Sequence, residues 1–187
     1  MDDRHWAGFT LIELLVTLTV LAALLMIAIP AMGQFIDRSR LRSAAEHLAA
    51  DLRFARSETI KASHGGNVHL SVRGDGTSWC YGLSRGAPCN CDPTGRRESG
   101  GCKRSASRDT LERIRYSREF PGIELLDVRF AGTTSTEFSS VRGTAKAGHV
   151  ELRSAHNQIL QVRLSLLGRV RICTPAGAAS PGGYFPC

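Results

Sequence analysis

The chain opens with a long apolar segment. Residues 9–29 are apolar except for four positions, Thr10, Glu13, Thr17 and Thr19. An α-helix of this length extends roughly 30 Å, which matches the hydrocarbon thickness of a bilayer. A secretory signal peptide carries its small-residue cleavage site after the apolar core, whereas here the small residue Gly8 precedes it. We therefore expect residues 9–29 to form a transmembrane helix that stays in the mature protein.

A helical spacing follows Pro30. Apolar or small residues recur in steps of four and three, which is the period of one helix face. They are Leu41, Ala45, Leu48, Leu52, Ala55 and Thr59. This stripe predicts that residues 30–63 form the amphipathic half of one helix running from about Phe9 to Ala62. Pro30 removes an intrahelical hydrogen bond and is expected to kink this helix, and Gly65-Gly66 is expected to end it.

The rest of the chain alternates with the period of β-strands. The expected strands are 67–73, 78–83, 123–130, 137–141, 149–153, 159–165 and 169–173. They predict an antiparallel β head over residues 64–173, followed by a tail, 174–187. The fold class is therefore α+β, with a long N-terminal α-helix packed on a C-terminal antiparallel β head. Residues 84–118 are rich in Gly, Arg and Cys without an apolar period, which predicts a long surface loop.

Charge adds a second line of inference. The chain has 24 Lys and Arg against 17 Asp and Glu, for a formal net charge of +7, and no acidic residue follows Glu151. Such a balance favours contact with phosphates or other anionic surfaces. Inside the apolar segment, the Glu13 carboxylate costs about 2–3 kcal/mol or more unless it is paired. Either this side chain reaches the near interface of the membrane, or it pairs with the N-terminal amine of a neighbouring subunit.

The stretch from Gly8 to Val16, GFTLIELLV, resembles the class III signal of type IV pilins and type II secretion pseudopilins. The resemblance implies that prepilin peptidase cleaves after Gly8, removes the leader (residues 1–8) and N-methylates Phe9. It also implies assembly with other pilins or pseudopilins through the apolar helix, in which Glu13 takes part. The protein would start in the bacterial inner membrane with its head in the periplasm and then enter a filament. The leader departs from the usual pattern because Asp2 and Asp3 outweigh Arg4.

The head is similar to the GspH/FimT family of minor pilins and pseudopilins, whose fold is pilin-like. The features that carry this resemblance are Phe138 to Gly143, Gly148-His149-Val150 and Gly168-Arg169-Val170-Arg171. The last of them matches the GRxR motif through which FimT-type minor pilins bind DNA in natural transformation.

The residue types suit that role. In a strand, Arg169 and Arg171 would point to one face about 6.6 Å apart, a spacing that approximates successive phosphates. Each guanidinium can bind a phosphate through two hydrogen bonds. Gly168 allows the preceding turn, and Arg163 on the neighbouring strand could lengthen the basic stripe. Because no array of base-reading side chains is evident, binding is expected to be independent of sequence. The alternative is an ordinary solvated strand face.

Six cysteines indicate an oxidising compartment. Cys173 and Cys187 bracket the Pro- and Gly-rich tail, and we expect them to form a disulfide. Direct pairing of Cys89 with Cys91 is sterically poor, which leaves two schemes. These are 80–89 with 91–102, and 80–91 with 89–102. A zinc site at Cys80, Cys89, Cys91 and Cys102 is the competing hypothesis, although the spacing is not that of a standard zinc knuckle.

No catalytic motif is present in the sequence, and the histidines after the leader are scattered. We therefore predict no enzyme activity, no metal and no cofactor. The first functional hypothesis is a minor pilin of a type IV pilus with a DNA-binding head. The second is an H-type minor pseudopilin of type II secretion, and the third is a structural priming subunit without a ligand.

Overall fold

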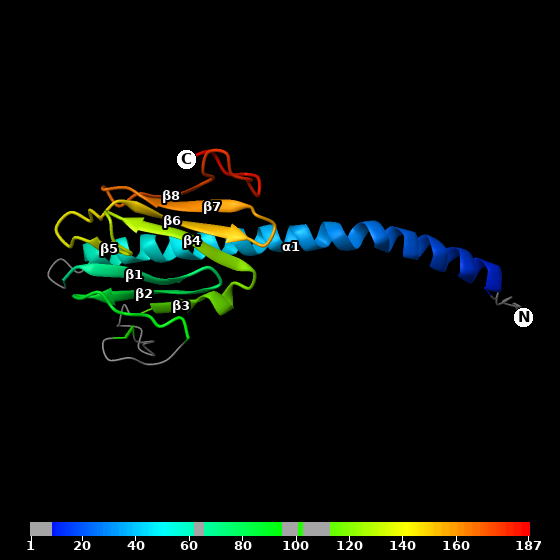
Figure 1. Ribbon diagram of the computed structural model, residues 1–187, viewed down its shortest axis with the longest axis horizontal. Coiled ribbons are helices and arrows are strands. Elements are labelled where there is room, and N and C mark those ends of the chain that lie inside the picture. The colour runs from blue at the N-terminus through cyan, green and yellow to red at the C-terminus, as the bar shows by residue number, and fades with distance from the viewer. Residues whose placement is uncertain (1–8, 62–65, 95–100, 103–112) are drawn as a thin grey trace, which may run out of the picture. The chain divides into compact units, whose positions relative to one another are not determined.

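The computed structural model describes residues 9–61, 66–94, 101–102 and 113–187. The predicted α+β class is confirmed, and the chain divides after Ile36 into two compact units. In chain order the elements are α1 (Leu11–Lys61), β1 (Val68–Asp75), β2 (Ser78–Arg85), β3 (Arg113–Tyr116), the 3-10 helix η1 (Ser117–Glu119), β4 (Ile123–Phe130), β5 (Ser135–Phe138), β6 (Gly148–Ser154), β7 (Ile159–Leu164) and β8 (Val170–Cys173) (Figure 1).

The first unit holds the apolar part of α1. Its most apolar 18-residue window has a mean hydropathy of 2.6 and no buried residue, so this helix is long and apolar enough to cross a membrane. The backbone stays helical at Pro30, and the kink expected there remains a prediction. α1 ends at Lys61, while Gly65 lies outside the described residues.

In the second unit, the rest of α1 packs on the β-strands (Figure 1). Every residue of the predicted stripe is buried, from Leu41 and Leu52, both 0% exposed, to Leu48 at 3%. The stripe shares one hydrophobic core with large side chains of the strands, among them Phe130 and Phe138. Burying one Leu or Phe side chain stabilises the folded state by about 1.5–3 kcal/mol. The shared core therefore holds this part of α1 against the strands.

The strands form two antiparallel sheets of four. The first has the order β3-β2-β1-β5, and the second has the order β4-β6-β7-β8. β6 and β7 are joined by a turn over residues 155–158, and β7 and β8 by a turn over residues 165–169. β8 therefore lies at the edge of the second sheet.

The structure corrects two predicted segments of the head. The predicted loop 84–118 in fact ends in β3, which pairs with β2 through Gly82 and Ile114, and in η1. Ile114 and Tyr116 of this strand pack in a small cluster with Cys80 and Cys91, and two such residues are too weak a signal to mark a strand. The predicted strand 137–141 is instead β5, residues 135–138, because its inward positions are Thr136 and Phe138, and Val141 is 84% exposed.

A buried carboxylate joins β3 to the helix. Asp51 of α1 is 4% exposed and accepts a hydrogen bond of 2.9 Å from the Tyr81 hydroxyl and one of 3.1 Å from Arg113. Arg115 lies 3.9 Å from the same carboxylate. Burial, followed by the Asp51 charge, raises the pKa of Tyr81 well above its usual value. The two arginines that made this segment look like a surface loop therefore neutralise a buried acid.

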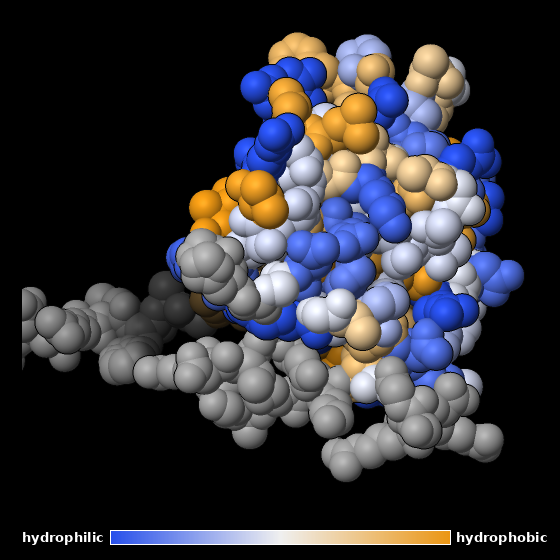
Figure 2. Space-filling model, turned by 90° about the vertical axis from the view of Figure 1, so that its left-hand side faces the viewer, coloured by the Kyte–Doolittle hydropathy of each residue, from blue (hydrophilic) through white to orange (hydrophobic). Residues whose placement is uncertain are grey.

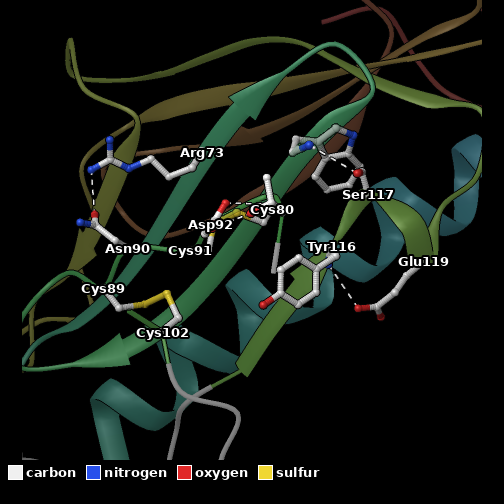
Figure 3. The surroundings of a disulfide bond; sticks show 12 residues. Arg73, Cys80, Cys89, Asn90, Cys91, Asp92, Cys102, Tyr116, Ser117 and Glu119 are labelled. Atoms are coloured by element: carbon white, nitrogen blue, oxygen red, sulfur yellow. Dashed lines mark hydrogen bonds between the residues drawn. A yellow bond between two sulfur atoms is a disulfide. The ribbon is translucent and has the colours of Figure 1, made fainter. Parts of the chain in front are cut away.

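The structure forms disulfides Cys80–Cys91 and Cys89–Cys102 (Figure 3), which is the second of the two pairings considered. A Cβ on Gly82 would lie 2.2 Å from the Cys102 sulfur, so only glycine fits beneath that disulfide. All four sulfur atoms are used in disulfides, and none of them remains as a thiolate for the zinc site.

Asp37 anchors the β6–β7 turn to α1. Its carboxylate is 6% exposed and accepts hydrogen bonds from the His156 backbone N–H at 3.2 Å and from the His156 ring at 2.9 Å. Burial alone would raise the pKa of Asp37, but hydrogen bonds from His156 and Ser154 and the nearby His156 charge lower it overall.

A lowered carboxyl pKa stabilises the fold above the unfolded-state value of about 3.9 and ceases to do so as pH falls through the folded-state value. We therefore expect the stability difference between wild type and Asp37→Asn to be full above about pH 5 and to shrink as pH falls through the lowered pKa of Asp37. Urea unfolding of both proteins across this range measures the difference. A difference independent of pH would show that the Asp37 charge does not stabilise the turn.

Candidate nucleic-acid interface

The β7–β8 turn positions the predicted basic motif. The Gly168 N–H donates to the Ser165 carbonyl at 2.9 Å, and the Ser165 N–H donates to the Arg169 carbonyl at 3.0 Å. Gly168 has φ +70°, a left-handed conformation that favours glycine. β8 starts at Val170, so Arg169 ends the turn and does not lie in the strand as predicted. Arg169 and Arg171 are exposed, and Val170 between them is 8% exposed.

Strand register places four basic side chains in one row across the second sheet. Arg171 of β8 is opposite Arg163 of β7, and Arg163 is opposite His149 of β6. His149 is in turn opposite Arg129 of β4. Because neighbouring strands lie about 4.8 Å apart, the row crosses the sheet over roughly 14 Å. Sequence reasoning included Arg163 but missed Arg129 and His149, because their alignment depends on long-range pairing.

The two ends of this row differ in net charge. At the β4 end, Asp127 lies 3.0 Å from the His149 ring and 3.7 Å from Arg129. At the β8 end, the Arg169 and Arg171 side chains make no hydrogen bond or ion pair with the described residues, and Arg163 donates one hydrogen bond of 3.3 Å to the Cys187 carbonyl. Positive charge available to a partner is therefore concentrated around β7 and β8.

A groove of about 810 Å³ runs beside these arginines. Its lining includes Arg163, Arg169 and Arg171 together with residues of the turn and the tail. The predicted disulfide Cys173–Cys187 is present and holds the tail against this edge of the sheet. The Thr174 N–H donates to the Phe185 carbonyl at 2.9 Å, so the end of the tail continues the sheet and forms one wall of the groove.

The tail is also tied to α1, which sequence reasoning missed. Arg42 donates hydrogen bonds to the carbonyls of Pro181 and Gly182, at 3.1 Å and 2.6 Å. The Tyr184 hydroxyl donates to Glu46 at 3.2 Å, and burial followed by the Glu46 charge raises the Tyr184 pKa. These contacts pair residues about 139 positions apart, and nothing in the local sequence of the tail signals them.

The surface around the turn mixes charge with apolar area. Figure 2 looks on the end of the head at which the β7–β8 turn lies, and hydrophilic side chains there alternate with small apolar clusters. Leu166 and Leu167 of the turn are 67% and 69% exposed.

The predicted processing site lies at the other end of the chain. Gly8 and the leader, residues 1–8, fall outside the described residues, and Phe9 is 86% exposed. The Thr10 hydroxyl accepts a hydrogen bond of 3.3 Å from the Glu13 N–H and so caps the first turn of α1. The Glu13 carboxylate has no partner within the described chain, which leaves it available to a neighbouring subunit.

A model of the GspH family, described as type II transport protein GspH, matches residues 44–168. The chain belongs to the GspH family. Its members are structural pilins and pseudopilins rather than enzymes. No curated protein and no solved structure matched the chain.

The GspH match covers α1 from Ala44 onward and the strands through β7, and it ends at Gly168. Arg169, Arg171 and the disulfide-bonded tail therefore lie beyond the matched region. Family membership together with the apolar helix fits a pilus or pseudopilus subunit anchored in the inner membrane. It implies interaction with other pilins or pseudopilins.

Proposed function

We propose that this GspH-family subunit is a minor pilin of a type IV pilus whose head binds DNA without sequence specificity for uptake in natural transformation. The observation that carries the proposal is the pair of exposed guanidiniums at Arg169 and Arg171, which have no partner in the described structure and border a groove. Arg163 stands opposite Arg171 and extends the same basic surface.

The chemistry of this surface suits the DNA backbone. Each guanidinium can donate two parallel hydrogen bonds to one phosphate, and the positive charge releases counterions from the DNA. The residues that line the groove include no asparagine, glutamine, tyrosine, tryptophan or phenylalanine. The polar contacts that the groove offers come mainly from three guanidiniums, which suit the phosphates of the backbone.

The N-terminal segment supports a place in a filament. In this proposal, prepilin peptidase removes residues 1–8 and methylates the amine of Phe9. Before assembly the protein stays anchored in the inner membrane, with the head in the periplasm, where its disulfides form. During assembly, the unpartnered Glu13 carboxylate pairs with the N-terminal amine of a neighbouring subunit, which removes the cost of a lone charge in the apolar phase.

One observation favours a second function, that of an H-type minor pseudopilin. The matching family model is described as a type II transport protein, and its match stops before Arg169. In this alternative the subunit supports pseudopilus assembly and protein secretion. The groove beside β8 would then contact other pseudopilins or a secreted protein.

An experiment in cells separates the two functions. The native gene is replaced by wild type, by Arg169→Ala/Arg171→Ala, or by Arg96→Ala/Arg97→Ala, a pair of adjacent arginines outside the motif. We expect the first double variant to lower transformation frequency at least tenfold while protein secretion stays normal, and the second to transform like wild type. A secretion defect with normal transformation would favour the pseudopilin function.

A further inference from the structure

A second hollow, of about 350 Å³, lies on the other side of Arg169, between the β7–β8 turn and α1. α1 contributes Arg53, Arg56, Ser57 and Ile60 to its lining, and the turn and β8 contribute Gly168, Arg169 and Val170. Arg169 thus borders both this hollow and the groove beside β8.

Gly168 is the residue that lets Arg56 approach the turn. A Cβ at Gly168 would lie 2.9 Å from both Cδ and Nε of Arg56 and 2.6 Å from the Gly143 carbonyl oxygen. Any larger residue would therefore push Arg56 away from the turn. The glycine of the motif has two functions, because it permits the left-handed backbone and it seats the side chain of Arg56 beside Arg169.

The hollow has positive charge without a counter-ion. The Nε atom of Arg56 is buried and has no hydrogen-bond partner. Arg53, Arg56 and Arg169 form no ion pair with any described residue. The two acids that flank this stretch of α1 are both paired elsewhere, Glu58 with Lys61 at 2.8 Å and Asp51 with Arg113 at 3.1 Å. A buried donor without a partner is unfavourable, and an anion that reached this atom from the hollow would supply the missing acceptor.

We propose that this hollow binds a phosphate group of the DNA backbone between Arg53 and Arg56 of α1 and Arg169 of the turn. The assignment to DNA rests on the proposed function, because Arg169 is shared with the groove and so links the two phosphate sites. A bound strand then passes over the β7–β8 turn, from the groove beside β8 to the face of α1. The helix is thereby part of the DNA-binding surface, although the basic motif lies in another element.

The test is fluorescence anisotropy of a labelled DNA duplex with the full-length protein in non-ionic detergent, over a range of salt concentrations. Arg56→Gln removes one charge in the hollow, and Arg40→Gln removes an exposed charge of the same helix that does not line it. Loss of one phosphate contact makes the negative slope of log K against log salt shallower by about 0.9. It also lowers the affinity about eightfold at 0.1 M salt. We expect that loss for Arg56→Gln, and wild-type behaviour for Arg40→Gln.

Arg56→Lys and a phosphate titration complete the design. Arg56→Lys keeps the charge but not the two-pronged donor, so the salt slope should stay near wild type while affinity falls. Inorganic phosphate should raise the melting temperature of wild type more than that of Arg56→Gln. Melting curves without phosphate show whether each variant is folded.

Failure of this inference is distinguishable from failure of the proposed function. If Arg171→Ala weakens DNA binding while folded Arg56→Gln binds with the wild-type slope, the hollow is not a DNA phosphate site. If wild type binds no DNA, the proposed function and the DNA assignment both fall. In that case, binding to vesicles containing anionic phospholipid that is lost in Arg56→Gln would reassign the hollow to a lipid headgroup.

Discussion

Replacing Gly8 with leucine is expected to leave the leader on the protein and to abolish its entry into filaments. The small residue before Phe9 is the position at which the signal resembles a prepilin cleavage site, and a bulky side chain there would obstruct the peptidase. Without cleavage, Phe9 has no free amine to pair with the Glu13 carboxylate of a neighbour. Mass spectrometry of protein extracted from membranes should find Phe9 as the first residue in wild type and Met1 in the variant.

Glu13→Gln is the matched control for this result. It should be processed normally and inserted at least as well as wild type, because it removes a charge that costs about 2–3 kcal/mol in the apolar phase. Its incorporation into filaments should nevertheless fall, since the amine of the neighbour loses its partner. Wild-type protein that retains Met1, or that is cut after residue 29, would rule out pilin-type processing.

The helix and most strands could be predicted because their signals are local. The stripe of α1, from Leu41 to Thr59, follows a helical period, and all of it is buried. β4 was predicted at its exact bounds, residues 123–130, because an apolar-rich run there is bounded by the turn residues Gly122 and Gly132. Such patterns depend on neighbouring residues alone, so a single sequence contains them.

What could not be predicted depends on contacts distant in sequence. β3 has few apolar residues, and it forms because Arg113 and Arg115 meet the buried carboxylate of Asp51. The approach of Arg56 to Gly168 joins α1 to a turn more than one hundred residues later, so it too required the fold. The motif itself was visible in the sequence, whereas its surroundings were not.

Replacing both Arg169 and Arg171 with alanine is expected to have the largest effect on DNA binding. If each side chain contacts one phosphate, the double variant loses two contacts. The slope of log K against log salt then becomes shallower by about 1.8, and affinity at 0.1 M salt falls about sixtyfold. Arg171→Lys keeps the charge without the two-pronged donor, so its loss should be smaller and less dependent on salt.

Both arginines are exposed and partnerless within the described structure, so their removal should leave the fold intact. Arg96→Ala/Arg97→Ala removes the same charge from the segment between β2 and β3 and serves as the control. If that pair weakened binding as much as the motif pair, diffuse charge rather than the motif would hold DNA.

The most direct measurement compares the salt dependence of DNA binding by full-length wild type and by Arg169→Ala/Arg171→Ala. Binding is measured by fluorescence anisotropy in non-ionic detergent, with two duplexes of unrelated sequence. A DNA-binding minor pilin should bind both duplexes equally, and log K should fall linearly with log salt. The slope should be clearly shallower in the variant. Equal affinities and slopes for wild type and a folded variant would contradict phosphate binding at β8 and favour the secretion pseudopilin.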